Sequence, residues 1–275
     1  MKKFSAIHLL LLALGLQLVA CNKKGDTNVF GSAVFIHASP GTPSFQVFVD
    51  TLGPINNTTV AYGSGSGYIG LIPGSRNITL ENRATTPKSV YSQLAENIEA
   101  GKAYSYFLYD TLDSKGLVRT LRLNDVLTLP SSSSAAIRFL NLAPNGGNMD
   151  VTLVRGTQYD TSSTSTQKLA FAAIDSITIT NQSYVGSTTP DVAALSAFKY
   201  AVTGVTGNSI AKGTTLVNIP AFNQNNRYLV KLKVAGTQTL LLSMATTLAP
   251  GRIYTVFSRG TARSQALGIF FVQHY

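Results

Sequence analysis

The chain has 275 residues, of which 44% are hydrophobic and only 12% are charged, and 22 basic against 12 acidic residues give a net charge of +10. This apolar content excludes an intrinsically disordered protein. The short runs of Val, Ile, Thr, Tyr and Phe are typical of β-sheet proteins and not of helical bundles.

The first 20 residues have the three parts of an export signal: Lys2 and Lys3, an apolar run over 7–18, and small residues before a cysteine. The run is too short to span a bilayer comfortably, which takes about 20 apolar residues. Its end, Leu18-Val19-Ala20-Cys21, resembles the lipobox of bacterial lipoproteins. We therefore predict a signal peptide over 1–20 and a lipid on Cys21. The alternative is an ordinary secreted protein in which Cys21 is incidental, but Cys21 is the only cysteine of the chain, and a free thiol is a liability in an oxidising compartment.

Cleavage before Cys21 would leave residues 21–29 as a polar, flexible tether. It would also remove Lys2 and Lys3, so that 20 basic and 12 acidic residues remain. Asn22 follows the cysteine where, in well-studied proteobacteria, an aspartate favours retention in the inner membrane. We therefore expect an outer-membrane lipoprotein of the cell envelope, and the sequence leaves open whether it faces the periplasm or the cell surface.

The strand pattern is clearest in Phe45–Asp50 and in Tyr228–Val234, where apolar side chains alternate with polar ones. Period-two runs separated by Pro-Gly, Asn-Gly and Gly-Ser turns predict antiparallel strands with one buried face. The predicted class is all-β, with two tandem immunoglobulin-like antiparallel β-sandwich domains. Between these runs we expect a flexible hairpin loop at Gly63–Gly67, and Val90–Ala100 could contain a helical turn.

Two pairs of segments repeat along the chain. Ala33–Pro40 aligns with Ile137–Pro144 at an offset of about 104 residues, and Glu99–Phe107 aligns with Ala249–Phe257 at an offset of about 150. The stretch Leu129–Ser134 between the copies has the composition of a linker. We therefore predict domain 1 over 30–128, a linker over 129–134, and domain 2 over 135–275 with an insertion at about 156–226.

The first copy contains four characteristic stretches: Phe35–Pro40, Phe45–Asp50, Val60–Gly63 with Gly67-Tyr68, and Ala100–Tyr104. In these stretches it resembles the bacterial domain-of-unknown-function family numbered 4397. The second copy keeps only the two ends of the pattern, and His37 and Ser39 become Asn141 and Ala143 there. The resemblance implies an exported protein, often a lipoprotein of Bacteroidota, and it implies no known activity.

Few residues are suited to catalysis. After cleavage the histidines are His37 and His274, so a His/Asp/Ser arrangement would most simply use His37. The plainer interpretation is that His37 forms hydrogen bonds near the Ser39-Pro40 turn and stabilises the strand geometry. A zinc site would lack a cysteine ligand once Cys21 carries lipid, and we predict no metal and no cofactor.

Two further patterns fail as functional motifs. Gly63–Gly67 has a glycine at its centre, where a nucleophile elbow has serine, and a strand-like run follows where a phosphate loop needs a helix. The arginines Arg119, Arg122, Arg252, Arg259 and Arg263 are scattered and not interleaved with aromatic residues. Such an arrangement is typical of a solvated face, so we expect no nucleic-acid partner.

Three triplets resemble the Asp-Ser/Thr-hydrophobic acceptor of O-glycosylation in Bacteroidota: Asp50-Thr51-Leu52, Asp110-Thr111-Leu112 and Asp175-Ser176-Ile177. Thr51, Thr111 and Ser176 are therefore candidate glycosylation sites, although triplets this short also occur by chance.

Two functions remain. The first is a non-catalytic lipoprotein, held to the membrane through Cys21, that presents Gly63–Gly67 and the 156–226 insertion to an envelope protein or glycan. The alternative is an envelope hydrolase that uses His37 or acidic residues of the insertion.

Overall fold

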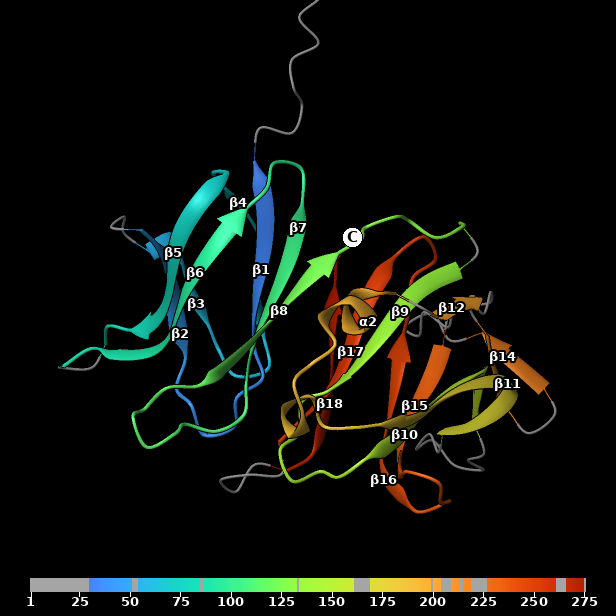
Figure 1. Ribbon diagram of the computed structural model, residues 1–275. Helices are drawn as coiled ribbons and strands as arrows, with labels where there is room; N and C mark the ends of the chain where they lie inside the picture. Colours follow the sequence, from blue (N-terminus) through green and yellow to red (C-terminus); the bar gives the residue numbers. More distant parts are fainter. Residues whose placement is uncertain are drawn as a thin grey trace, which may run out of the picture.

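The computed structural model describes residues 30–50, 54–84, 87–132, 134–160, 169–198, 200–203, 209–212, 215–218, 227–260 and 266–274. Nearly all the regular structure in these ranges is β-strand (Figure 1), which confirms the all-β class. The helical content of the described residues is the 3-10 turn η1 (Val185–Ser187) and the five-residue helix α2 (Val192–Ser196). No helix among them is long and apolar enough to cross a membrane.

The first half of the chain forms two four-stranded sheets. One has the order β4 (Gly65–Leu71), β1 (Gly31–His37), β7 (Ala103–Tyr109), β8 (Arg119–Asp125). The other has the order β3 (Pro54–Val60), β2 (Phe45–Val49), β5 (Gly74–Asn82), β6 (Ser89–Ile98). All pairs are antiparallel except β1 with β7, which is parallel.

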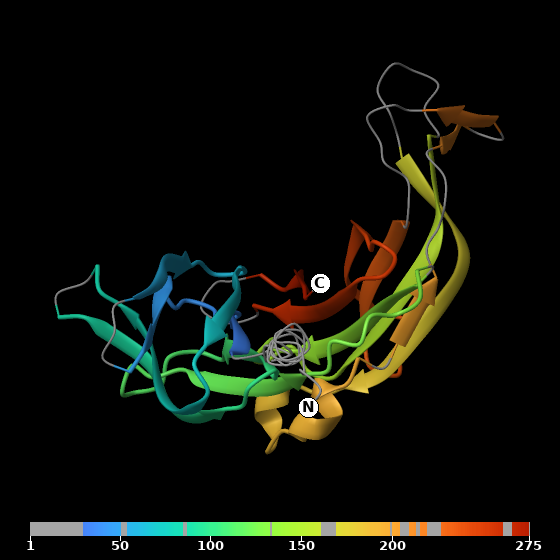
Figure 2. The same ribbon diagram turned by 90° about the horizontal axis from the view of Figure 1, so that it is seen from above.

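The second half repeats this strand order. One sheet is β12 (Tyr200–Thr203), β9 (Ser134–Asn141), β17 (Ile253–Arg259), β18 (Gly268–Gln273), with β9 parallel to β17. The other contains β11 (Leu169–Gln182), β10 (Met149–Asp160), β15 (Arg227–Val234) and β16 (Leu240–Thr247), and the far end of β10 also pairs with the hairpin of β13 (Ser209–Lys212) and β14 (Thr215–Asn218). Seen from above, the β10–β11 hairpin curves away from the rest (Figure 2).

The Gly-basic-x-Tyr motif that repeats in the sequence closes a turn in each half. In the first half the hydroxyl of Tyr104 on β7 accepts a hydrogen bond from the backbone N–H of Glu99 at 3.1 Å. In the second half Tyr254 does the same for Ala249 at 3.0 Å. Gly101 and Gly251 occupy the left-handed region, with φ of 72° and 68°, where a glycine avoids the steric cost of a side chain. The motif is therefore explained by turn geometry.

Three apolar layers hold the chain together. One lies between the two sheets of the first half and one between the two main sheets of the second half. The third lies between the halves, where β1, β7 and β8 face β9, β17 and β18. Phe107 and Phe257 meet there edge to face, with ring centroids 5.8 Å apart. Strands β1 and β7 are consequently buried on both faces, which explains their nearly unbroken apolar sequences.

Two sequence predictions about local structure are wrong. Val90–Ala100 contains no helical turn, because Ser89–Ile98 form β6 in register with β5. Gly63–Gly67 is not a loop throughout, because β4 begins at Gly65, which pairs with Ile36 of β1. Only the first residues of that stretch, Gly63 and Ser64, belong to the β3–β4 connection.

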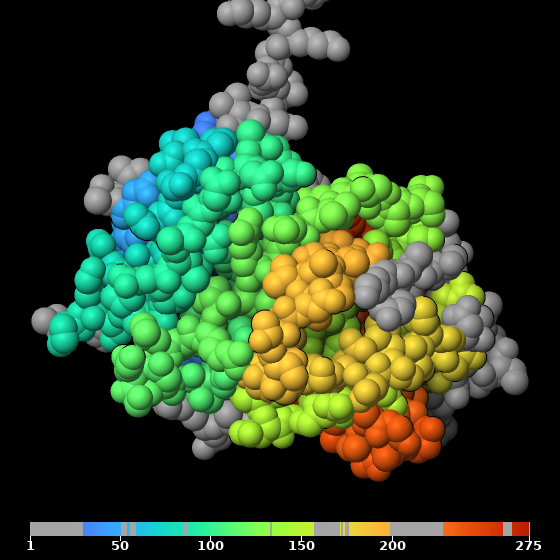
Figure 3. All heavy atoms as spheres, viewed as in Figure 1, coloured from blue at the N-terminus to red at the C-terminus, as the bar shows by residue number. Residues whose placement is uncertain are grey.

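The inserted segment of the second half does not only form outer loops. Residues 183–198, which contain η1 and α2, pack beside β8 of the first half, where the gold and green surfaces meet (Figure 3). The Ser196 hydroxyl accepts a hydrogen bond from the backbone N–H of Asn124 at 3.0 Å, and Arg119 donates to the carbonyl of Gly186 at 2.7 Å. This part of the insertion joins the two halves.

Candidate functional site

His37 lies at the end of β1 and is completely buried. Its Nε2 lies 3.1 Å from the carbonyl oxygens of both Thr42 and Pro43, and its Nδ1 accepts from the backbone N–H of Ser39 at 3.3 Å. Nε2 therefore carries the proton. Burial lowers the pKa of His37 to about 4, against the opposing effect of the two carbonyl bonds. The neutral imidazole holds the loop that connects β1 to β2.

Asn141, the counterpart of His37 on β9, makes an equivalent set of bonds. Its Oδ1 accepts from the N–H of Ala143 at 3.3 Å, and its Nδ2 donates to the carbonyls of Gly147 and Gln182 at 2.8 and 3.0 Å. An amide has a donor and an acceptor, as a neutral imidazole does. The role of His37 in the loop is therefore repeated in the second half by a side chain that does not titrate.

The most extensive polar cluster lies at the junction of the two halves, and sequence reasoning missed it. Arg138 of β9 is almost fully buried, and its Nη1 lies 2.7 Å from Oδ1 of Asp125 at the end of β8. Its Nη2 donates to Ser105 Oγ at 3.1 Å, and Ser105 donates to Asp125 Oδ2 at 2.6 Å. The guanidinium group also lies 4.4 Å from the ring centroid of Phe198.

The cluster closes into a ring through Thr255, His274 and Tyr68. Arg138 Nε donates to Thr255 Oγ1 at 2.7 Å, and Thr255 lies 2.7 Å from Nε2 of His274. Nδ1 of His274 lies 2.7 Å from the hydroxyl of Tyr68, which donates to Asp125 Oδ2 at 2.7 Å. Because Tyr68 donates its hydroxyl proton to Asp125, its oxygen accepts from His274, which therefore carries its proton on Nδ1. Nε2 of His274 then accepts from the hydroxyl of Thr255. We call these six residues the junction ring: Tyr68, Ser105, Asp125, Arg138, Thr255 and His274.

The junction ring takes corresponding positions from each half. Ser105 and Thr255 are equivalent residues of β7 and β17, and Asp125 and His274 lie opposite the equivalent residues Ala103 and Ile253. The bond between Ser105 and Asp125 in the first half therefore corresponds to the bond between Thr255 and His274 in the second half. Burial lowers the pKa of His274 to about 4, although Asp125 opposes the shift. Burial also lowers the pKa of Arg138, and Asp125 again acts in the opposite direction.

A second contact between the halves lies at the other end of the junction. The guanidinium group of Arg259, at the end of β17, is buried between two rings, with its central carbon 3.4 Å from the centroids of both Tyr62 and Phe270. Tyr62 comes from the first half and also meets His37 edge to face, with centroids 5.6 Å apart. Arg259 therefore couples the β3–β4 connection to β17 and β18 by cation–π contacts.

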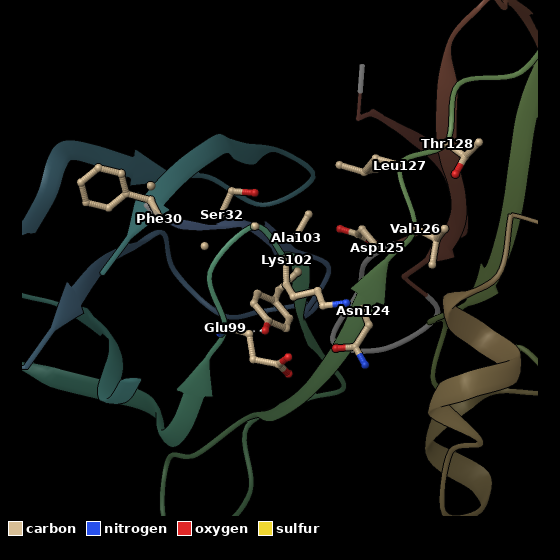
Figure 4. A pocket seen from close by; sticks show the side chains of 14 residues that line it. Phe30, Ser32, Glu99, Lys102, Ala103, Asn124, Asp125, Val126, Leu127 and Thr128 are labelled. Carbon is tan, nitrogen blue, oxygen red and sulfur yellow. Dashed lines mark hydrogen bonds between the residues drawn. The ribbon is translucent and has the colours of Figure 1, made fainter. Parts of the chain in front are cut away.

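The described residues also enclose a hollow of about 720 Å³ beside the start of β1. It is lined by the turn before β7 and by the chain that leaves β8, and its lining includes Phe30, Lys102, Asn124 and Val126. Figure 4 shows the Lys102 side chain extending toward Asn124. The lining carries the ammonium group of Lys102 and the carboxylates of Glu99 and Asp125 amid backbone and apolar atoms, so its charge is mixed.

The remaining predicted sites lie apart from one another. Cys21 and Thr51 lie outside the described residues. Thr111 is half-buried after β7, and its N–H is bound at 2.7 Å by the carboxylate of Asp110, whose φ is 72°. Ser176 is exposed within β11. Among the described residues, no three His, Cys, Asp or Glu side chains gather as a metal site would require.

Residues 32–152 match the family model of a domain of unknown function, DUF4397. Over this stretch the chain is similar to the DUF4397 family. The DUF4397 match begins at the second residue of β1, covers the rest of the first half and continues through β9 into β10. It includes four of the six ring residues and ends before Thr255 and His274. No curated protein matches the chain.

Proposed function

We propose that the protein is a non-catalytic, lipid-anchored protein of the cell envelope that presents loops of a rigid β scaffold to a protein or glycan partner. The observation that carries this proposal is the junction ring. It joins the two halves through the contacts of Arg138 with Asp125 and Ser105 and of Tyr68 with His274, and the apolar layer between the halves adds burial.

The bonding of the titratable groups supports a scaffold. Both described histidines are buried and neutral, and each has both nitrogens engaged within the protein. A general base needs a nitrogen that can reach a substrate proton. The bonds of His37 have an amide counterpart at Asn141, which supports a structural role for this histidine.

The tether supports an envelope location. A lipobox-like Leu18-Val19-Ala20-Cys21 is followed by eight mostly polar residues, 22–29, that lead to Phe30 and β1. The loops that follow β1, β7 and β15 lie at the end of the molecule far from the start of β1, so they point away from the anchor. Leu117 and Leu240 are exposed there, at 40% and 53%. We propose these loops as the contact surface for the partner.

The lipid is tested by metabolic labelling in the native host with an alkyne-bearing fatty acid. The wild-type chain is expected to incorporate label and to fractionate with membranes, and Cys21→Ser to do neither. Equal fractionation of the two forms would overturn the anchor.

The binding role is tested by photo-crosslinking in cells from a light-activated residue at position 117 or 240. A discrete crosslinked species is expected from these positions and not from exposed Thr178 on β11. A hydrolytic activity that His37→Asn abolishes in a folded chain would favour an enzyme.

A further inference from the structure

The most exposed large apolar side chains of the described residues gather at one end of the molecule. Val126, Ile72, Leu129 and Phe30 are 66%, 57%, 57% and 56% exposed, and the next, Leu240, is 53% exposed at the opposite end. Isolated exposed apolar residues are ordinary, but a group of them at one end indicates a contact surface.

The sheet register explains why these four residues share one end. Gly31 pairs with Leu71, which places Phe30 beside Ile72, and Ala103 pairs with Asp125, which places Val126 beside the turn before β7. Leu129 lies in the connection that runs from β8 to β9 at the same end (Figure 1). We call this surface, with the adjacent basic residues Lys102 and Arg252, the N-terminal end.

The loops of the N-terminal end are held in place. Arg76 donates from Nε to the carbonyl of Ile72 and from Nη2 to that of Pro73, each at 2.9 Å. The N–H of Gly101 bonds to the carbonyl of Phe30 at 3.0 Å, and the N–H of Ser32 to that of Lys102 at 2.8 Å. The apolar tips are therefore presented on a rigid base, so little conformational entropy is lost when they are buried.

The chain itself indicates what covers this end. Eight residues lie between Cys21 and Phe30, and an extended chain over these nine residue-to-residue steps spans roughly 30 Å at most. A lipid on Cys21 would therefore hold the N-terminal end within that distance of the bilayer. In the turns before β7 and β17 the exposed charged side chains are Lys102, Arg252 and Glu99. The two basic groups outnumber the one carboxylate and complement phosphate groups of a membrane surface.

We propose that the N-terminal end docks onto the phospholipid bilayer that holds the Cys21 lipid. Phe30, Ile72, Val126 and Leu129 enter the interfacial layer, and Lys102, above the hollow, contacts a lipid phosphate. This docking rests on the proposed function, because the lipid on Cys21 supplies the proximity. It directs the opposite loops away from the membrane.

The experiment uses the full lipidated protein in vesicles of phosphatidylethanolamine and phosphatidylglycerol. Cys21 is the only cysteine, so a cysteine introduced by Ile72→Cys or Val126→Cys can be labelled alone with nitrobenzoxadiazole, and Leu240→Cys is the matched control. All three positions are more than half exposed, so the label is tolerated. Reduction of the label by external dithionite is expected to be at least about threefold slower at 72 and 126 than at 240, because interfacial burial shields it.

The outcomes separate the two proposals. Mass spectrometry of the same preparation reports whether Cys21 carries lipid. A lipidated chain with equal reduction rates at all three positions overturns the docking and leaves the anchor intact. A chain without lipid on Cys21 overturns the proposed function and the docking with it. Slower reduction at 72 but not at 126 also overturns the docking as stated, since both tips must enter together.

Discussion

Asn141 has a hydrogen-bond pattern like that of His37 at the equivalent position of the second half: each accepts from the backbone N–H two residues later and donates to a carbonyl of the following loop. The second acceptor differs, because it is Pro43 of the same loop for His37 and Gln182 of β11 for Asn141. We therefore expect His37→Asn to change the free energy of unfolding by less than about 1 kcal/mol. His37→Ala, which leaves two buried carbonyls unsatisfied, is expected to lower it by about 1–3 kcal/mol. Urea unfolding of both variants measures the difference. Equal losses would contradict a hydrogen-bonding role for the imidazole.

Stability is expected to fall in mild acid because of the two buried histidines. Their folded pKa of about 4 lies below the unfolded value of 6.5, so the unfolded chain binds more protons between these values. The contribution of each histidine to the free energy of unfolding is complete above pH 6.5 and is lost as the pH falls toward 4. This loss is on the order of 3 kcal/mol for each histidine. Urea midpoints measured between pH 7.5 and 4 check this, and His37→Asn should show a weaker dependence than the wild type. Identical pH profiles would refute the assignment.

Arg138 and Asp125 are expected to be strongly coupled. Arg138→Met removes the cation and leaves a buried, unpaired carboxylate, which is expected to lower the free energy of unfolding by about 3–5 kcal/mol. Asp125→Asn leaves the guanidinium group unpaired. The double variant removes both charges, so it should lose less free energy of unfolding than the two single variants lose together. A double-mutant cycle by urea unfolding gives the coupling, and additivity within about 0.5 kcal/mol would mean that the pair does not act as a unit.

Gly63 is expected to tolerate no side chain while Arg259 is in place. Its φ is 82°, and a Cβ would lie 2.2 Å from an Arg259 Nη. Gly63→Ala therefore combines backbone strain of about 1–2 kcal/mol with displacement of the guanidinium group from its two rings. In an Arg259→Ala background only the strain should remain. If the cost of Gly63→Ala is the same in both backgrounds, as determined by thermal unfolding, the contact is unimportant.

The two halves are expected to unfold together. Phe107 and Phe257 meet in the apolar layer between them, and truncation of a buried Phe to Ala costs about 3–5 kcal/mol. Phe107→Ala and Phe257→Ala should each lower a single midpoint seen by circular dichroism and by tyrosine fluorescence. A transition that splits in two, with only one phase shifted by each variant, would show that the halves are independent.

Much of the fold was predictable from the sequence because the strands that face a single core alternate. The alternation in Tyr228–Val234 places Tyr228, Val230, Leu232 and Val234 on one face. The structure buries the first three, whereas Val234, the last residue of β15, is 38% exposed. The repeated segments were recognisable because the turns after β1 and β9 have the same hydrogen-bond pattern, as do the turns before β7 and β17. Val90–Ala100 was misjudged, since Val90, Leu94 and Ile98 follow a spacing that also fits a helix, and only pairing with β5 selects the strand.

The junction ring was not predictable, because its residues lie far apart in sequence. Tyr68, Ser105, Arg138 and Thr255 fall within the repeated or family-like stretches, but those patterns indicate strands and turns and give no partner for a polar side chain. The clearest signal of the ring is Arg138, a charge inside the otherwise apolar run Ala135–Leu140. Such a residue on a doubly buried strand requires a buried partner. The partner, Asp125, lies only 13 residues earlier, but nothing in the sequence shows that the two sheets face each other.

The parallel pairing of β1 with β7 also determines how the molecule would respond to force. A pull on the start of β1 acts along the strand, which lies between β4 and β7. The hydrogen bonds on both sides run across that direction, so they are loaded together in shear and are not unzipped one at a time. A force applied between the start of β1 and the loops at the opposite end would therefore be resisted at β1, and the architecture suits a protein that must carry mechanical load.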